Sequence, residues 1–137
     1  MTPNTLTPND RASFNEAMAG ILSDHAMLRR LAAATTAHLG SSVDDAMSLA
    51  AAMATHEATE ARLFELPFVT RPPELVTTTA NRARQRCAEF TSGSYHLPDV
   101  RAAEALFVDA LLAHLAAEEA WLRHEDEHQK DRLNTIN

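Results

Sequence analysis

The chain has 137 residues, enough for one domain with a single hydrophobic core but too few for two comfortable domains. Its alanine-rich and leucine-rich composition, with three glycines, favours an all-α fold. The formal net charge of −7 argues against binding to nucleic acid or to an anionic membrane surface, because no basic patch is available.

Cysteine content and hydropathy bear on the cellular setting. The single cysteine, Cys87, excludes an internal disulfide. The N-terminus lacks the charged and apolar regions of a secretory signal, and no stretch has the apolar length of a membrane span. We therefore expect a cytoplasmic protein that forms one domain over residues 1–137, with a short tail over 1–7 and a frayed end over 132–137.

The first helix has clear signals at both ends. Thr7 is a suitable cap, Pro8 suits the first helical position, and Asp10 complements the positive end of the helix. The helix should run to about Leu39 and stop at Gly40, which readily adopts the left-handed conformation of a helix cap.

Three more helices follow, joined by short connections. We expect them over residues 42–66, from 73 to a fading end at 91–94, and over 98–132, with a proline-rich connection over 67–73. Short connections make consecutive helices neighbours of opposite direction. The sequence thus predicts an antiparallel, up-down-up-down four-helix bundle.

Each helix carries an inward stripe at spacings of three and four residues. In chain order these stripes are Phe14, Met18, Ile21, His25, Leu28, Ala32, Thr35 and Leu39; Ala46, Leu49, Met53, His56, Glu60 and Leu63; Val76, Ala80, Ala83, Cys87 and Phe90; and Phe107, Leu111, His114, Glu118 and Trp121. We also expect Phe64 to pack with Trp121 in the core.

Three of the four stripes are interrupted by residues that normally avoid a core. The interrupting residues are His25, His56, Glu60, His114 and Glu118. An unpaired carboxylate in an apolar interior is costly, and five polar intrusions in one small core are hard to offset by chance pairing. The pattern therefore predicts a metal site in the bundle core.

The spacing of these residues supports that prediction. His25 and His56 lie about 15 residues on either side of the first turn, so an antiparallel pair of helices brings them level. Glu60 and Glu118 each follow a histidine by four residues, which places them on the same helix face. Three imidazoles and two carboxylates suit iron or manganese and are tolerable for zinc. Without a metal ion, we expect carboxylate repulsion to raise at least one pKa.

The ordered motifs of three helices resemble the hemerythrin-like, or HHE cation-binding, domain family. They are Asp24-His25, His56-Glu57-x-x-Glu60-x-x-Leu63-Phe64 and His114-x-x-x-Glu118-Glu119, and the resemblance spans about Thr7 to His128. It implies a four-helix bundle with a non-haem di-iron centre whose ligands are His25, His56, Glu60, His114 and Glu118. Members bind dioxygen reversibly, sense oxygen or iron, or handle peroxide or nitric oxide.

The third helix departs from the family pattern, which usually places at least one histidine there. The stripe of this helix is apolar apart from Cys87, and Asn81 and Gln85 fall on the opposite face. Three outcomes follow: a di-metal site completed by more water, a single-metal site, or a degenerate site that binds little.

Several neighbouring residues have alternative roles. Glu119 is a rival to Glu118 but lies about 140° around the helix from His114. Glu57 is expected at the surface or orienting an imidazole. His124 and His128 share a metal-like spacing, yet their charged surroundings favour a solvated helix end.

The expected function is metal binding, with dioxygen, nitric oxide or peroxide as the small partner. Two alternatives remain open: a di-iron or mononuclear oxidase or peroxidase on the same site, and a metal-free helical interaction module. The sequence does not decide whether two copies pair as a homodimer.

Overall fold

The structure, a computed structural model, describes residues 6–37, 44–92 and 97–136. These residues form four α-helices and no strand: α1 (Pro8–Ala37), α2 (Asp44–Phe64), α3 (Glu74–Ser92) and α4 (Leu97–Ile136). The expected all-α bundle of four helices is therefore confirmed for the described part of the chain. The expected cap at Gly40, the expected start of the second helix at Ser42 and the side chain of Leu39 lie outside these ranges.

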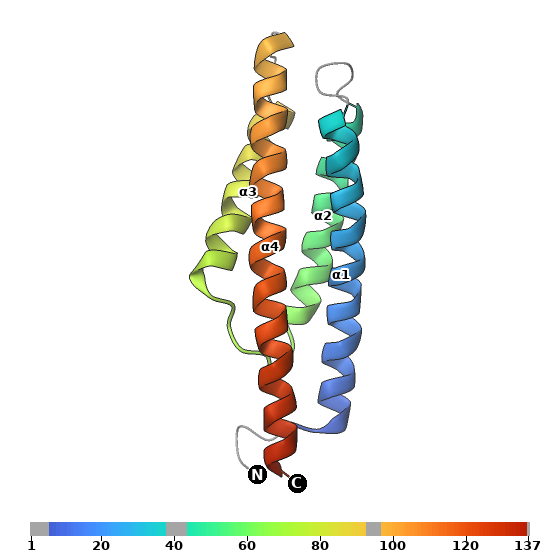
Figure 1. The fold of residues 1–137 in the computed structure, drawn as a ribbon, viewed down its shortest axis with the longest axis vertical. Helices are drawn as coiled ribbons and strands as arrows, with labels where there is room; N and C mark the ends of the chain where they lie inside the picture. Colours follow the sequence, from blue (N-terminus) through green and yellow to red (C-terminus); the bar gives the residue numbers. More distant parts are fainter. Residues whose placement is uncertain (1–5, 38–43, 93–96, 137) are drawn as a thin grey trace.

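The helices associate as two close pairs. α1 packs along α2, and α3 packs along α4, while α1 and α4 join the pairs and α2 touches α3 only sparsely (Figure 1). The connection after α2 runs behind α4 to reach the start of α3 (Figure 1). No helix within the described ranges has both the length and the hydropathy that crossing a membrane requires.

The start of α1 shows how local sequence fixes a helix end. The Asp10 backbone N–H donates to Thr7 Oγ1 over 3.1 Å, and the Thr7 backbone N–H donates to Asp10 Oδ2 over 3.0 Å. This reciprocal pair is a capping box, with aspartate in place of the usual glutamate, and it satisfies two backbone donors that the helix leaves free. The predicted cap at Thr7 is confirmed.

The apolar core is divided into two clusters. The upper cluster contains Leu28, Leu49, Met53, Ala83, Phe90, Phe107, Leu111 and Leu115, and the lower cluster contains Phe14, Ile21, Leu63, Val76, Trp121 and Leu122. Nearly all of these residues belong to the predicted stripes, because residues three and four apart share one helix face. Between the clusters lies a polar layer that is described below.

Two local expectations differ from the structure. Phe64, expected in the core, is 41% exposed and covers Trp121 from outside, with ring centroids 5.6 Å apart. Phe64 is the last residue of α2, one position beyond the buried Leu63, so its side chain leaves the inward face. α4 also continues past the expected end at Arg132 to Ile136.

Candidate metal centre

One layer of the core is polar and buried. It is formed by His25 of α1, His56 and Glu60 of α2, and His114 and Glu118 of α4. All five side chains are buried, and Glu118 is 0% exposed. On α1, the histidine lies between Ile21 of the lower cluster and Leu28 of the upper cluster, so apolar layers seal the polar one from both sides.

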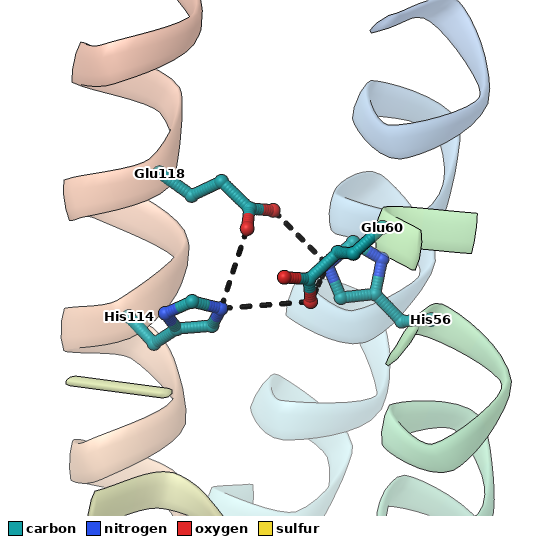
Figure 2. A group of neighbouring side chains, drawn as sticks. All are labelled: His56, Glu60, His114 and Glu118. Atoms are coloured by element: carbon teal, nitrogen blue, oxygen red, sulfur yellow. Dashed lines mark hydrogen bonds and ion pairs between the residues drawn. The ribbon is translucent and has the colours of Figure 1, made fainter. Parts of the chain in front are cut away.

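Four of these residues meet at one point. One ligand atom from each of His56, Glu60, His114 and Glu118 lies within 4.8 Å of the others, a group that could hold a metal ion (Figure 2). Glu60 Oε1 lies 3.0 Å from His56 Nε2 and 3.6 Å from His114 Nε2. Glu118 reaches the same two nitrogens with its two oxygens, at 3.2 Å and 3.5 Å. Two carboxylates thus bridge two imidazoles across the bundle.

His25 joins this group from α1. Its Nε2 lies 2.9 Å from Glu118 Oε1, and its ring meets the His56 ring edge-on with centroids 4.8 Å apart. The two histidines are therefore level, as predicted from their distances to the first turn. His25 is not within the 4.8 Å group of four, so it enters the site through Glu118.

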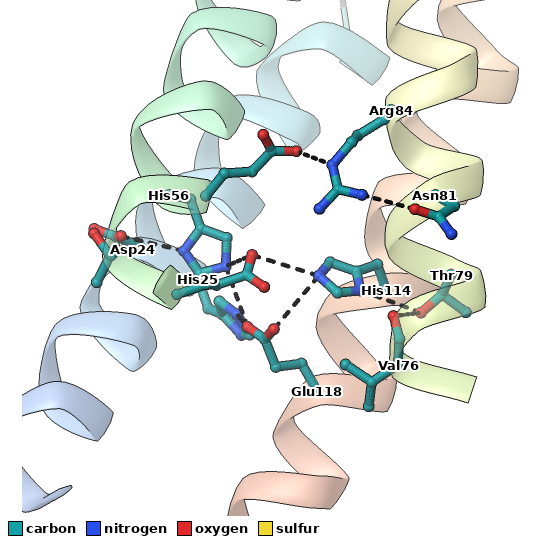
Figure 3. A network of polar contacts seen from close by, with 12 residues as sticks. Asp24, His25, His56, Val76, Thr79, Asn81, Arg84, His114 and Glu118 are labelled. Carbon is teal, nitrogen blue, oxygen red and sulfur yellow. Dashed lines mark hydrogen bonds and ion pairs between the residues drawn. The ribbon is translucent and has the colours of Figure 1, made fainter. Parts of the chain in front are cut away.

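Two of the imidazoles are fixed through their Nδ1 atoms by carboxylates outside the group. His56 Nδ1 lies 3.2 Å from Asp24 Oδ2, and His25 Nδ1 lies 2.6 Å from Glu119 Oε2 (Figure 3 shows the Asp24 contact). Because an ionised carboxylate only accepts, both Nδ1 atoms donate a proton to these bonds. Glu119 is itself held by an ion pair with Arg29.

A threonine of α3 fixes the third imidazole, that of His114, through its Nδ1 atom. Thr79 Oγ1 lies 3.1 Å from His114 Nδ1 and 3.1 Å from the Val76 carbonyl (Figure 3). It also lies 2.8 Å from the Leu75 carbonyl. The hydroxyl has one proton, which it donates to a carbonyl, so it accepts from His114 Nδ1–H. The His114 Nε2 atom then faces the centre.

Sequence reasoning missed these outer partners. Asp24 was visible beside His25, but it contacts His56 on the neighbouring helix, and nothing in the sequence indicated a role for Thr79. Glu57, expected at the surface or orienting an imidazole, is partly exposed and pairs with Arg84 of α3 over 2.7 Å. Which side chains meet across helices depends on helix rotation, which residue spacing does not reveal.

Electrostatics favour charged groups in this layer. Burial alone lowers the pKa of His56, but its contacts with Glu118 and Glu60 outweigh burial and raise that pKa to about 10. Burial alone raises the pKa of Glu60, but hydrogen bonds with His114 and His56 bring it well below its ordinary value. The expectation that repulsion raises a carboxylate pKa is wrong for Glu60, because its hydrogen bonds, with Glu118 among the partners, lower its pKa instead.

The donor set fits a transition metal. Imidazole nitrogens and carboxylate oxygens together suit iron, manganese or zinc. Glu118 Oε2 is buried without a hydrogen-bond partner among the described residues, which marks an acceptor that the protein alone leaves unsatisfied. Imidazoles anchored through Nδ1 to a carboxylate or hydroxyl are typical of metal-ligating histidines.

The remaining candidates lie away from this group. Cys87 is partly buried beside the upper apolar cluster, and Asn81 is exposed and bonded to Arg84, so α3 offers only Thr79 to the layer. His124 and His128 are exposed on α4, which agrees with the expected solvated helix end. No second group of this kind occurs in the ranges that the structure describes.

Comparison of the chain with models of known protein families, with curated proteins and with solved structures finds no match. The site therefore rests on its own geometry: a buried group of two histidines and two glutamates that could hold a metal ion, with a third histidine joined to it.

Proposed function

We propose that the protein is a hemerythrin-like, non-haem iron-binding protein that binds or senses a small ligand such as dioxygen, nitric oxide or peroxide. The proposed ligands are His25, His56, Glu60, His114 and Glu118. One observation carries the proposal: imidazoles and carboxylates from three helices converge in a single buried layer, and each imidazole is anchored by its far nitrogen.

The course of the chain supports the family assignment. In Figure 1 each helix runs opposite to the one before it, which favours the antiparallel, up-down-up-down order of hemerythrin-like bundles. The motifs that carry the resemblance lie on α1, α2 and α4, and their histidines all face the same layer.

The protein's own residues would do three things for a metal ion. Asp24, Glu119 and Thr79 hold the Nδ1 protons of the imidazoles, so the Nε2 atoms are directed to the centre. Glu60 and Glu118 supply negative charge that balances a cation. Bound iron would supply redox-active coordination positions suited to a small diatomic ligand or peroxide.

The layer is also protected from water. The upper and lower apolar clusters lie on either side of it, and its five polar side chains are at most 7% exposed. Burial away from solvent lowers the local dielectric constant, which strengthens the attraction between a cation and the carboxylates. A buried centre of this kind suits reversible binding or sensing of an uncharged gas.

The contribution of α3 bears on whether the site holds one metal ion or two. It places Thr79 against His114 and contributes no imidazole, so the described residues offer five ligand side chains in all. The family resemblance favours two irons completed by water, whereas the compact group of four favours one.

The test is a ligand-binding experiment on loaded protein. Purified chain without an affinity tag is loaded anaerobically with ferrous iron and then exposed to dioxygen, nitric oxide or peroxide while absorption is recorded. We expect new visible absorption in wild type and in His124→Ala, whose histidine is exposed, but not in His56→Ala. Identical spectra for wild type and His56→Ala would overturn the proposal.

A further inference from the structure

A separate cavity opens beside the metal centre. It has a volume of 590 Å³ and lies between α3, α4 and the connection that joins α2 to α3. That volume is within the range of small-molecule sites in proteins. None of the five proposed metal ligands lines it, so the cavity is distinct from the centre.

The inner wall of the cavity is apolar. Val76, Ala117 and Trp121 form its deep side, and Leu75 and Ala120 lie nearer the surface. Leu75 is 62% exposed, the highest value among the exposed large hydrophobic side chains of the described residues. An apolar molecule in the cavity would cover Leu75 and remove this surface from water.

The rim of the cavity carries nitrogen donors. Arg71, His124 and His128 all line it, and all three are exposed. Arg71 forms no ion pair or hydrogen bond with any residue that the structure describes. A guanidinium presents parallel donors that match the two oxygens of a carboxylate. The rim therefore complements a negatively charged head group.

One acidic residue, Glu125, also lines the cavity, but its oxygens already accept hydrogen bonds within the protein. Glu125 is 0% exposed, and its carboxylate accepts hydrogen bonds from Thr70 and from Gln129 Nε2, the latter over 3.0 Å. Its role is to hold the connection before α3 against α4, which shapes the cavity. It does not present a free carboxylate to the rim.

We propose that this cavity binds an amphipathic carboxylate. Its hydrocarbon chain would lie along Leu75, Ala120 and Trp121, and its carboxylate would pair with Arg71. Carboxylates with a short hydrocarbon chain combine these two features at a size that the cavity accepts. The proposal is independent of the metal centre, since no proposed ligand takes part.

Decanoate, well below its micelle-forming concentration, is the probe. Its binding to the purified full-length chain is measured by calorimetry and by the fluorescence of Trp121, the only tryptophan in the sequence. We expect saturable binding that weakens about tenfold in Arg71→Gln, because a charge-assisted pair is lost. Arg30→Gln, an exposed arginine of α1 that does not line the cavity, should bind as wild type does.

A second variant tests the location. Ala120→Phe places a ring in the cavity from an exposed position and should abolish decanoate binding while circular dichroism shows unchanged helix content. Decan-1-ol, which has the chain without the charge, should bind about tenfold more weakly than decanoate. Absence of saturable binding, equal affinity in Arg71→Gln, or full binding by a folded Ala120→Phe would each overturn the proposal.

Discussion

Raising the pH should destabilise the metal-free protein, because His56 is held in its protonated form. The pKa of His56 rises from 6.5 to about 10 on folding, chiefly through Glu118 and Glu60, which outweigh the opposing effect of burial. A raised pKa contributes stability that is complete below pH 6.5 and is lost as the pH approaches 10. The side chain is 1% exposed, so solvent screening removes little of the effect.

The magnitude follows from the size of the shift. Each pKa unit corresponds to about 1.4 kcal/mol, so moving from pH 7 to pH 9 should reduce the free energy of unfolding by up to about 3 kcal/mol. For a chain of this length, that lowers the melting temperature by up to about 10 °C. The free energy of unfolding is measured by urea unfolding at pH 7, 8 and 9 in the presence of chelator. Circular dichroism follows the unfolding.

Variants separate this effect from other titrations. His56→Gln cannot titrate, so its free energy of unfolding should be lower at pH 7 and nearly level to pH 9. His124→Gln changes an exposed histidine and should retain the wild-type slope. A wild-type stability that stays level between pH 7 and pH 9, or a slope that persists in His56→Gln, would refute the reasoning.

Three further changes have defined outcomes. Asp24→Asn weakens the hydrogen bond that holds His56 Nδ1 and should lower metal affinity about tenfold or more. A competition titration with a metal chelator measures the affinity, and Glu127→Gln, at an exposed position, should leave it unchanged. Leu63→Ala, fully buried in the lower cluster, should cost about 2–5 kcal/mol in urea unfolding, and a cost below 1 kcal/mol would contradict the packing. Thr7→Ala removes the cap of α1 and should cost about 1 kcal/mol in the same assay; no loss would show that the capping box contributes nothing.

The inward faces of the helices could be predicted from the sequence because residues three and four apart lie on one side of a helix. All six inward residues predicted for α2, from Ala46 to Leu63, are buried. The same periodicity placed His25, His56 and His114 in one core. The level positions of His25 and His56 followed from their distances to the first turn, since the rise per residue of a helix is constant.

Contacts between helices could not be predicted in the same way. Asp24 reaches His56 rather than the neighbouring His25, and Thr79 reaches His114, because of how each helix is rotated about its axis. Glu57, beside His56, instead turns toward Arg84. Rotation is set by the packing of the whole core, which no single motif encodes.

The state of the buried charges also needed the structure. From the sequence, two glutamates in one core suggested mutual repulsion. In the structure, Glu60 contacts the Nε2 atoms of His56 and His114, so its pKa is lowered rather than raised. Whether buried acids repel or are paired depends on distances of a few ångströms between side chains of different helices.

The central claim is that this polar layer holds a metal ion. The most direct measurement is metal content per chain, by elemental analysis of untagged protein after anaerobic loading with ferrous iron and gel filtration, for wild type, His56→Ala and His124→Ala. The account predicts retained iron in wild type and in His124→Ala, near two ions for a di-iron centre or about one for a single-ion site, and its loss in His56→Ala. Wild-type protein that retains no metal would contradict the account.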